Sequence, residues 1–333
     1  MGSVLSGPSL GVLASATAAV AIGCGVLLQR GVAGTTNRTI GFLHPCAKDG
    51  GGGERVLWCA IRAIMRARPQ AQVVLFTDLP PHTPGEDLCA LLSERARTRF
   101  GVELPSRFEV VELSGESVDA AVDPRRWPTC TRLMQAACSV RLGVEALTGG
   151  RAPALLIDTA GFPFALPLAR LLGCRTAAYV HYPWVRRSSP WEESGRVAHA
   201  GGFPFLLRAT GKAAYGALLV FLYGAAGWCA QVAMVNSSWT KQHIQGLWWG
   251  WGTAHGKAAG PFRVYPPCST GELASLPLAP RGKPRAPLLI SVGQFRPEKA
   301  HALQIRCASR VAFAIACCTP QWWVPFCPLH LHC

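Results

Sequence analysis

The sequence predicts an α/β fold with a parallel sheet, and three observations carry this prediction. Short apolar runs recur along the chain with helical patterns between them, which is the order of strands and crossover helices. The chain has 333 residues, enough for about two domains with cores of their own. Hydrophobic residues make up 50% of it, which excludes a disordered protein.

An uncharged segment near the amino terminus is long enough to cross a membrane. Residues 10–28 hold no charged side chain, and a helix of this length spans about 28 Å. No basic residue precedes the segment, whereas Arg30, Arg38 and Lys48 follow it, so the positive-inside rule predicts a cytosolic body. A cleaved signal peptide is the alternative, disfavoured because a basic leader is missing. We therefore expect a membrane anchor over residues 1–38.

A glycine-rich segment joins the first predicted strand to the first predicted helix. The strand covers residues 39–43, four consecutive glycines occupy 50–53, and an amphipathic helix follows over 54–68. Such a turn presents backbone N–H groups and the positive end of a helix dipole at one point, which suits a phosphate. Its spacing is neither that of a nucleoside-triphosphate loop nor that of the dinucleotide fingerprint. A tight structural turn is the alternative.

Polar residues follow the next predicted strands, which lie at residues 73–77, 155–158, 176–180 and 232–236. Ligands of open α/β sheets lie in the crevice beyond the carboxyl ends of the strands. His181 comes directly after such an end and is a catalytic candidate, with a hydrogen-bonded structural histidine as the alternative. Asp158 is a weaker candidate of the same kind.

The uncharged segment 213–235 is interpreted as a helix packed in the domain or lying on a membrane surface, followed by a strand.

The last predicted strand, at residues 288–292, leads into a glycine turn with two cations. Arg296 offers a forked donor and Lys299 a point charge, and both match a diphosphate. An ordinary charged loop is the alternative. Proline-rich stretches precede this strand and predict a domain boundary near residue 280.

The net charge of the chain indicates which kinds of partner it could bind. The formal net charge is +15, and dispersed arginines suit phosphates or anionic lipids, although a coding bias toward arginine explains the excess equally well. No nucleic-acid module is found, so we expect no nucleic-acid partner.

Of the 14 cysteines, five lie within residues 307–333 together with two histidines, but the short paired spacings of a zinc site are missing. We expect no metal and no cofactor.

Six motifs together resemble a known family. They are His44-Pro45, 50–59 (GGGGERVLWC), 179–183 (YVHYP), 235–240 (VNSSWT), 264–268 (VYPPC) and 291–299 (SVGQFRPEK). In this order they resemble the GDP-mannose-dependent α-1,2-mannosyltransferases of the endoplasmic reticulum that assemble dolichol-linked oligosaccharides. The resemblance implies a retaining glycosyltransferase of GT-B fold, anchored by a single membrane pass with its body on the cytosolic face.

The resemblance also implies a reaction and residue roles. The enzyme would add the fourth and fifth mannoses, in α-1,2 linkage, from GDP-mannose to the dolichyl-diphosphate-linked Man(3)GlcNAc(2) core. Other mannosyltransferases of the pathway are candidate partners. His181 is implied as the catalytic residue. The implied donor-phosphate ligands are Gly51, Gly52, Gly53, Arg296 and Lys299.

The resemblance stops after residue 306. It implies an acceptor-binding domain over residues 39–280, the start of a donor domain over 281–306, and a Cys- and Trp-rich tail without helical or strand period over 307–333. The family's pair of donor-binding glutamates has no counterpart in that region. We therefore expect the chain alone to be inactive or nearly so. The alternative is a membrane-anchored module that binds the acceptor or a partner without catalysis.

Overall fold

The computed structural model describes residues 38–148, 152–185, 203–249, 260–268 and 300–318, together with Thr270, Ser275 and Ser291. Two compact units divide after residue 269, and each is considered by itself. The predicted anchor segment 10–28 lies outside the described residues, as does the predicted strand 288–292 apart from Ser291.

Seven parallel strands form one sheet in the first unit, in the order β3-β2-β1-β4-β5-β6-β7. They are β1 (Thr39–Leu43), β2 (Gln72–Thr77), β3 (Glu109–Glu112), β4 (Leu155–Asp158), β5 (Arg175–Val180), β6 (Val232–Val235) and β7 (Phe262–Arg263). From β1 the chain builds outward to β3, and from β4 it builds outward on the other side to β7. The strand order therefore reverses between β1 and β4, and this switch point is the usual place for a ligand. The predicted parallel α/β fold is confirmed.

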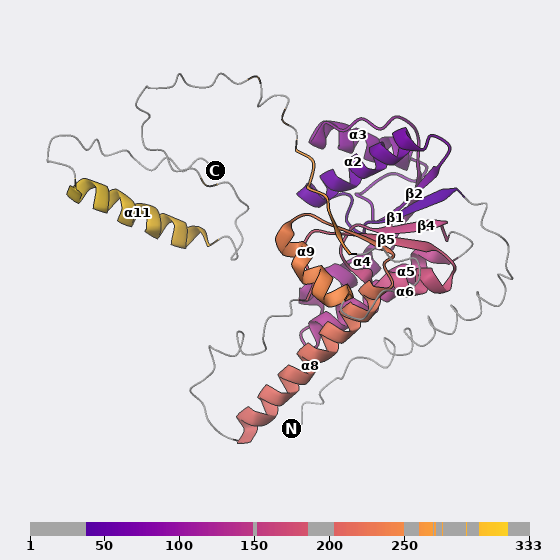
Figure 1. Cartoon of the computed structure of the whole chain (residues 1–333). Coiled ribbons are helices and arrows are strands. Elements are labelled where there is room, and N and C mark those ends of the chain that lie inside the picture. The colour runs from indigo at the N-terminus through magenta and orange to yellow at the C-terminus, as the bar shows by residue number, and fades with distance from the viewer. Residues whose placement is uncertain are drawn as a thin grey trace. The chain divides into compact units, whose positions relative to one another are not determined.

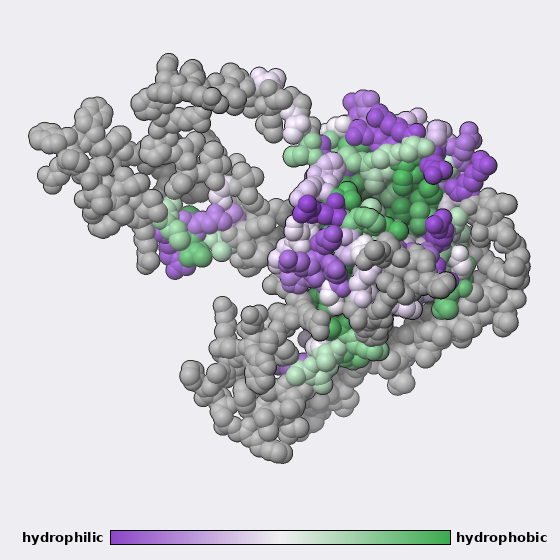
Figure 2. Space-filling view, viewed as in Figure 1, coloured by the Kyte–Doolittle hydropathy of each residue, from purple (hydrophilic) through white to green (hydrophobic). Residues whose placement is uncertain are grey.

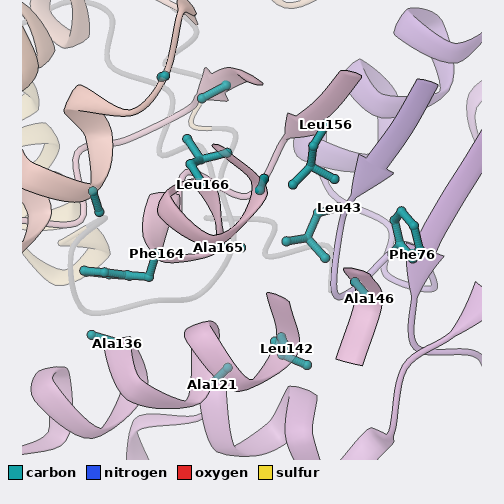
Figure 3. Close-up of a cluster of buried hydrophobic side chains, with 14 of the residues drawn as sticks. Leu43, Phe76, Ala121, Ala136, Leu142, Ala146, Leu156, Phe164, Ala165 and Leu166 are labelled. Carbon is teal, nitrogen blue, oxygen red and sulfur yellow. The ribbon is translucent and has the colours of Figure 1, made fainter. Parts of the chain in front are cut away.

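Helices cover both faces of this sheet (Figure 1). On one face lie α2 (Gly52–Ala67) and α3 (Leu88–Phe100), and on the other lie α4 (Gly115–Val122), α5 (Thr131–Leu147), α6 (Leu166–Leu171) and α8 (Phe203–Trp228). Side chains along a strand alternate between the faces. Phe42 therefore joins the core under α2, whereas Leu43 joins the opposite core with Phe76 and Leu156, as Figure 3 shows.

The sequence located most of these strands. β1 and β4 have the predicted bounds, and the other predicted strands of the described sheet differ by one residue at one end. The first helix differs more, because α2 begins at Gly52 and not at Glu54. Two of the four glycines therefore belong to the first helical turn. Strands β3 and β7 were not predicted.

The uncharged segment 213–235 forms the end of α8 and then β6, as interpreted from the sequence. Leu219 and Tyr223 of α8 are buried in the core, whereas Leu218 and Phe221 are 43% and 53% exposed. This apolar surface over α8 is visible in Figure 2. None of the helices among the described residues is long and apolar enough to cross a membrane.

The described residues of the second unit include one helix, α11 (His301–Cys318). The sequence predicted no regular structure after residue 306. That prediction is wrong for residues 307–318, which continue α11. This stretch is rich in alanine, which favours a helix even where no clear apolar face marks it.

Candidate active site

Polar side chains from β1 and β4 meet at the switch point of the sheet. His44 follows β1 and Thr159 follows β4, and both side chains are almost completely buried. The Nδ1 atom of His44 lies 2.8 Å from the Oγ1 atom of Thr159. The same hydroxyl lies 3.2 Å from the carbonyl oxygen of Leu43. This contact fixes the imidazole of His44 at the carboxyl edge of the two central strands.

Glu54 connects this edge to the first turn of α2. Its Oε2 atom accepts a hydrogen bond of 2.6 Å from the backbone N–H of Gly51, and its Oε1 atom lies 3.4 Å from Nε2 of His44. Burial raises the pKa of Glu54, but the contacts with His44 and the N–H of Gly51 outweigh it, so the pKa lies below its ordinary value. Glu54 is therefore an ionised carboxylate that holds the glycine turn against β1.

The glycine turn has two different parts. Gly51 is the N-cap residue of α2, and its N–H is already bound by Glu54. The first hydrogen bond of the helix runs from the N–H of Arg55 to the carbonyl of Gly51. The N–H groups of Gly52 and Gly53 come before it and therefore take no part in the hydrogen bonds within the helix. A Cβ atom at Gly52 would meet nothing within 4 Å, and one at Gly53 would lie 3.5 Å from Nε2 of His181.

His181 stands opposite Gly53, at the end of β5. Its Nε2 atom is buried and has no hydrogen-bond partner among the described residues. Burial lowers the pKa of His181, and the nearby His44 lowers it further, against a smaller opposing effect of Glu54. A neutral imidazole whose Nε2 atom is uncommitted can donate one hydrogen bond to a bound substrate or accept one from it.

Asp158 lies behind this edge and does not face the glycine turn. It is 1% exposed, and it lines a small apolar cavity between β4 and helices α4 and α5, with Leu43, Val122, Ser139 and Leu142. Its Oδ1 atom accepts the N–H of Ala160 at 3.0 Å, and its Oδ2 atom has no partner among the described residues. Burial raises the pKa of Asp158 to about 7.

The structure brings together four of the six residues predicted for the site, namely Gly51, Gly52, Gly53 and His181. Arg296 and Lys299 lie outside the described residues. His44, Glu54 and Thr159 were not predicted as site residues. The position of Glu54 could have been predicted from the sequence, because a Glu three residues after an N-cap completes a capping box. No group of three His, Cys, Asp or Glu side chains that could hold a metal is found in the described part of the chain.

The doubly wound sheet and its polar switch point define a class of α/β proteins that bind ligands at the carboxyl edge of the strands. A family model described as ALG11 mannosyltransferase N-terminus matches residues 37–248, which include this edge. The chain belongs to this family.

Curated relatives carry the name GDP-Man:Man(3)GlcNAc(2)-PP-Dol alpha-1,2-mannosyltransferase. The one from Homo sapiens is 37% identical over 286 residues, which cover 84% of this chain and 54% of the relative. The one from Mus musculus is 36% identical over 284 residues, with the same coverage, 84% and 54%. The chain therefore spans about half the length of the curated relatives it matches.

Among solved structures, UGT2 from Phytolacca americana gives a TM-score of 0.35 at 14% identity, over 68% of this chain and 52% of that chain. A UDP-glucosyltransferase from Polygonum tinctorium gives a TM-score of 0.35 at 14% identity, over 75% of this chain and 56% of that chain.

Proposed function

We propose that the first unit is the acceptor side of an α-1,2-mannosyltransferase that extends the dolichyl-diphosphate-linked Man(3)GlcNAc(2) core. Membership of the family and the names of the curated relatives support this reaction. The observation that carries the proposal is the uncommitted Nε2 atom of His181 opposite Gly53, at the carboxyl edge of the sheet.

In the proposed reaction the bond between C1 of mannose and the diphosphate of GDP breaks, and GDP leaves with the bonding electrons. An acceptor hydroxyl oxygen bonds to C1 with retained configuration, and its proton passes to an oxygen of the departing diphosphate. Negative charge grows on the leaving diphosphate, so N–H groups at Gly52 and Gly53, with the cations Arg296 and Lys299, would stabilise the transition state without a metal. His181 would hold a hydroxyl of the reacting mannose.

The setting of the reaction belongs to the proposal as well. The fold would be GT-B, with the seven-stranded unit as its acceptor-binding domain. Residues 10–28 would cross the endoplasmic-reticulum membrane once and leave the body of the chain on the cytosolic face. The partners would be GDP-mannose, the lipid-linked oligosaccharide and other mannosyltransferases of the pathway.

Lipid-linked oligosaccharide analysis tests the reaction. The whole chain is inserted into vesicles and incubated with labelled GDP-mannose and the lipid-linked Man(3)GlcNAc(2) acceptor. Extended products that an α-1,2-mannosidase trims back, and that His181→Ala abolishes, are the result expected of a catalytic chain. Extension that is unchanged in His181→Ala would overturn the role of His181.

The second candidate is an acceptor-binding module without catalysis. It is favoured by the region that the family model matches, which is described as the N-terminal part of these enzymes. Binding of the lipid-linked acceptor without any mannose transfer, in the same vesicles, distinguishes it from the first candidate.

A further inference from the structure

Three exposed aromatic side chains follow the carboxyl ends of β5, β6 and β7. Tyr182 is 52% exposed, Trp239 42% and Tyr265 64%. The rings of Tyr182 and Trp239 stack with centroids 5.3 Å apart and planes inclined by 24°. We call Tyr182, Trp239 and Tyr265 the aromatic platform.

An arginine links Tyr265 of the platform to the residue beside Trp239. The guanidinium of Arg263 lies 5.1 Å from the ring centroid of Tyr265 and donates a hydrogen bond of 2.6 Å to Oγ of Ser238, the residue before Trp239. The hydroxyl of Tyr179 donates to the carbonyl of Val264 at 2.8 Å, which ties the end of β7 to β5. The platform is therefore attached to the sheet at several points.

The exposure of these three rings contrasts with several other large rings of this unit, although Phe221, Trp228 and Phe262 are exposed as well. Trp58, Tyr223 and Trp248 are completely buried, as aromatic side chains are when only packing determines their place. Leaving large rings in water forgoes the free energy of burial, on the order of 25 cal/mol for each Å². A cluster of exposed rings at one edge of a sheet therefore indicates a surface that meets a ligand.

The strand order fixes where the platform lies relative to His181. Along the carboxyl edge the order is the glycine turn and His44 beside β1, Thr159 at β4, His181 at β5, and then the residues after β6 and β7. The platform thus begins at the neighbour of His181 and extends away from the glycine turn. Neighbouring strands lie about 4.8 Å apart, so it extends over roughly 10 Å.

We propose that the aromatic platform binds the saccharide of the acceptor, with its end at His181. The flat C–H face of a sugar ring packs on an aromatic ring, and its hydroxyl groups need hydrogen-bonding neighbours, which Arg263 and Ser238 supply. Two sugar rings match the length of the platform. This inference rests on the proposed function, because the acceptor is the saccharide that must approach His181.

A membrane surface is the other ligand that exposed Trp and Tyr side chains suit. The neighbours of the platform favour the saccharide. Trp239 packs against the His243 ring, with centroids 4.0 Å apart, and the other neighbours are a guanidinium and a hydroxyl. These groups form hydrogen bonds with hydroxyl groups and do not enter a hydrocarbon layer readily.

Titration with the free Man(3)GlcNAc(2) oligosaccharide, which carries no lipid and no diphosphate, tests the platform. Binding is measured by calorimetry on the whole chain, and folding of every variant is checked by circular dichroism and thermal unfolding. Trp239→Ala and Tyr182→Ala are each expected to weaken binding about fivefold, since one ring contact is worth about 1 kcal/mol. Tyr182→Phe keeps the ring and should bind within about twofold of the unmodified chain. Trp228→Ala, at an aromatic residue of α8 outside the platform, is the matched control.

The outcomes separate this inference from the proposed function. Unchanged oligosaccharide binding in both alanine variants, or no binding by the folded unmodified chain, would overturn the platform. If the alanine variants no longer bind phosphatidylcholine vesicles but still bind the saccharide, this result would also overturn the platform. It would assign the rings to a membrane surface. Mannose transfer that depends on His181, with unaltered acceptor KM in Trp239→Ala, would leave the proposed function standing and reject the platform alone.

Discussion

The imidazole of His44 and the hydroxyl of Thr159 lie 2.8 Å apart, although 115 residues separate them in the sequence. The contact joins β1 to β4, the two strands between which the strand order of the parallel sheet reverses. Because Glu54 holds the other side of the same imidazole, one buried histidine links both central strands to the first turn of α2. The stability of this edge can therefore be tested apart from any reaction.

Thr159→Val is expected to lower the free energy of unfolding by about 1–3 kcal/mol. The substitution keeps the shape of the side chain but leaves Nδ1 of His44 buried without its partner. Urea unfolding measures the change. Thr159→Ser retains the hydroxyl and serves as the control, so an equal loss in both variants would contradict the role given to the hydrogen bond.

The pair of Glu54 and His44 is expected to show coupled effects. Glu54→Ala removes the acceptor of the Gly51 N–H and also the partner of His44, which together cost about 1–3 kcal/mol. Each single alanine variant leaves the other side chain unpaired, so the double variant should lose less than the sum by about 1 kcal/mol or more. A double-mutant cycle from urea unfolding tests this, and additive losses would show that the two side chains do not interact.

Asp158 is expected to make the chain less stable as pH rises toward neutrality. Its pKa in the folded chain is about 7, above the ordinary value of 3.8, so between these values the folded state keeps a proton that the unfolded state has released. The stability from this group is complete below the ordinary pKa and is lost as pH rises through 7, by about 1.4 kcal/mol per pH unit. Asp158→Asn should remove this slope. Unfolding at several pH values measures it, and identical slopes in the two proteins would refute the burial of this carboxyl.

Two glycines of α8 should respond to alanine in opposite directions. A Cβ atom at Gly227 would overlap the indole of Trp248, whereas one at Gly216 would meet nothing within 4 Å. We expect Gly227→Ala to destabilise the chain by about 1–3 kcal/mol through overpacking. Gly216→Ala should stabilise it by up to about 1 kcal/mol, because alanine favours a helix. Thermal unfolding of the two variants tests the packing of α8. Higher stability in both variants would contradict the close contact between Gly227 and Trp248.

The sequence predicted the parts of the fold that carry strong local patterns. The central strands are continuous apolar runs because both of their faces are covered, so β1 and β4 could be located to the residue. β3 was missed because its four residues begin and end with glutamate, as suits a strand at the edge of the sheet. The helix α3 has only a weak local pattern, because charged residues interrupt its apolar face.

The site was predictable where a local sequence pattern gives the position of a residue, as it does for His181 and the glycine turn. His181 follows an apolar strand directly, and the rule for parallel sheets then places it at the carboxyl edge. The role of Thr159 depends on β1 and β4 being neighbours, which no local pattern states. The exposure of Tyr182 and Trp239 likewise follows from tertiary packing, because aromatic residues in a sequence are expected to be buried.

The reversal of strand order between β1 and β4 has a consequence for how the chain folds during synthesis. The amino-terminal strands β1, β2 and β3 can pair as soon as they emerge, but one side of β1 waits for β4, which the ribosome adds more than 100 residues later. Until then the middle of the final sheet is an open strand edge, able to pair with another chain. Nascent chains should therefore depend most on chaperones before Asp158 has emerged.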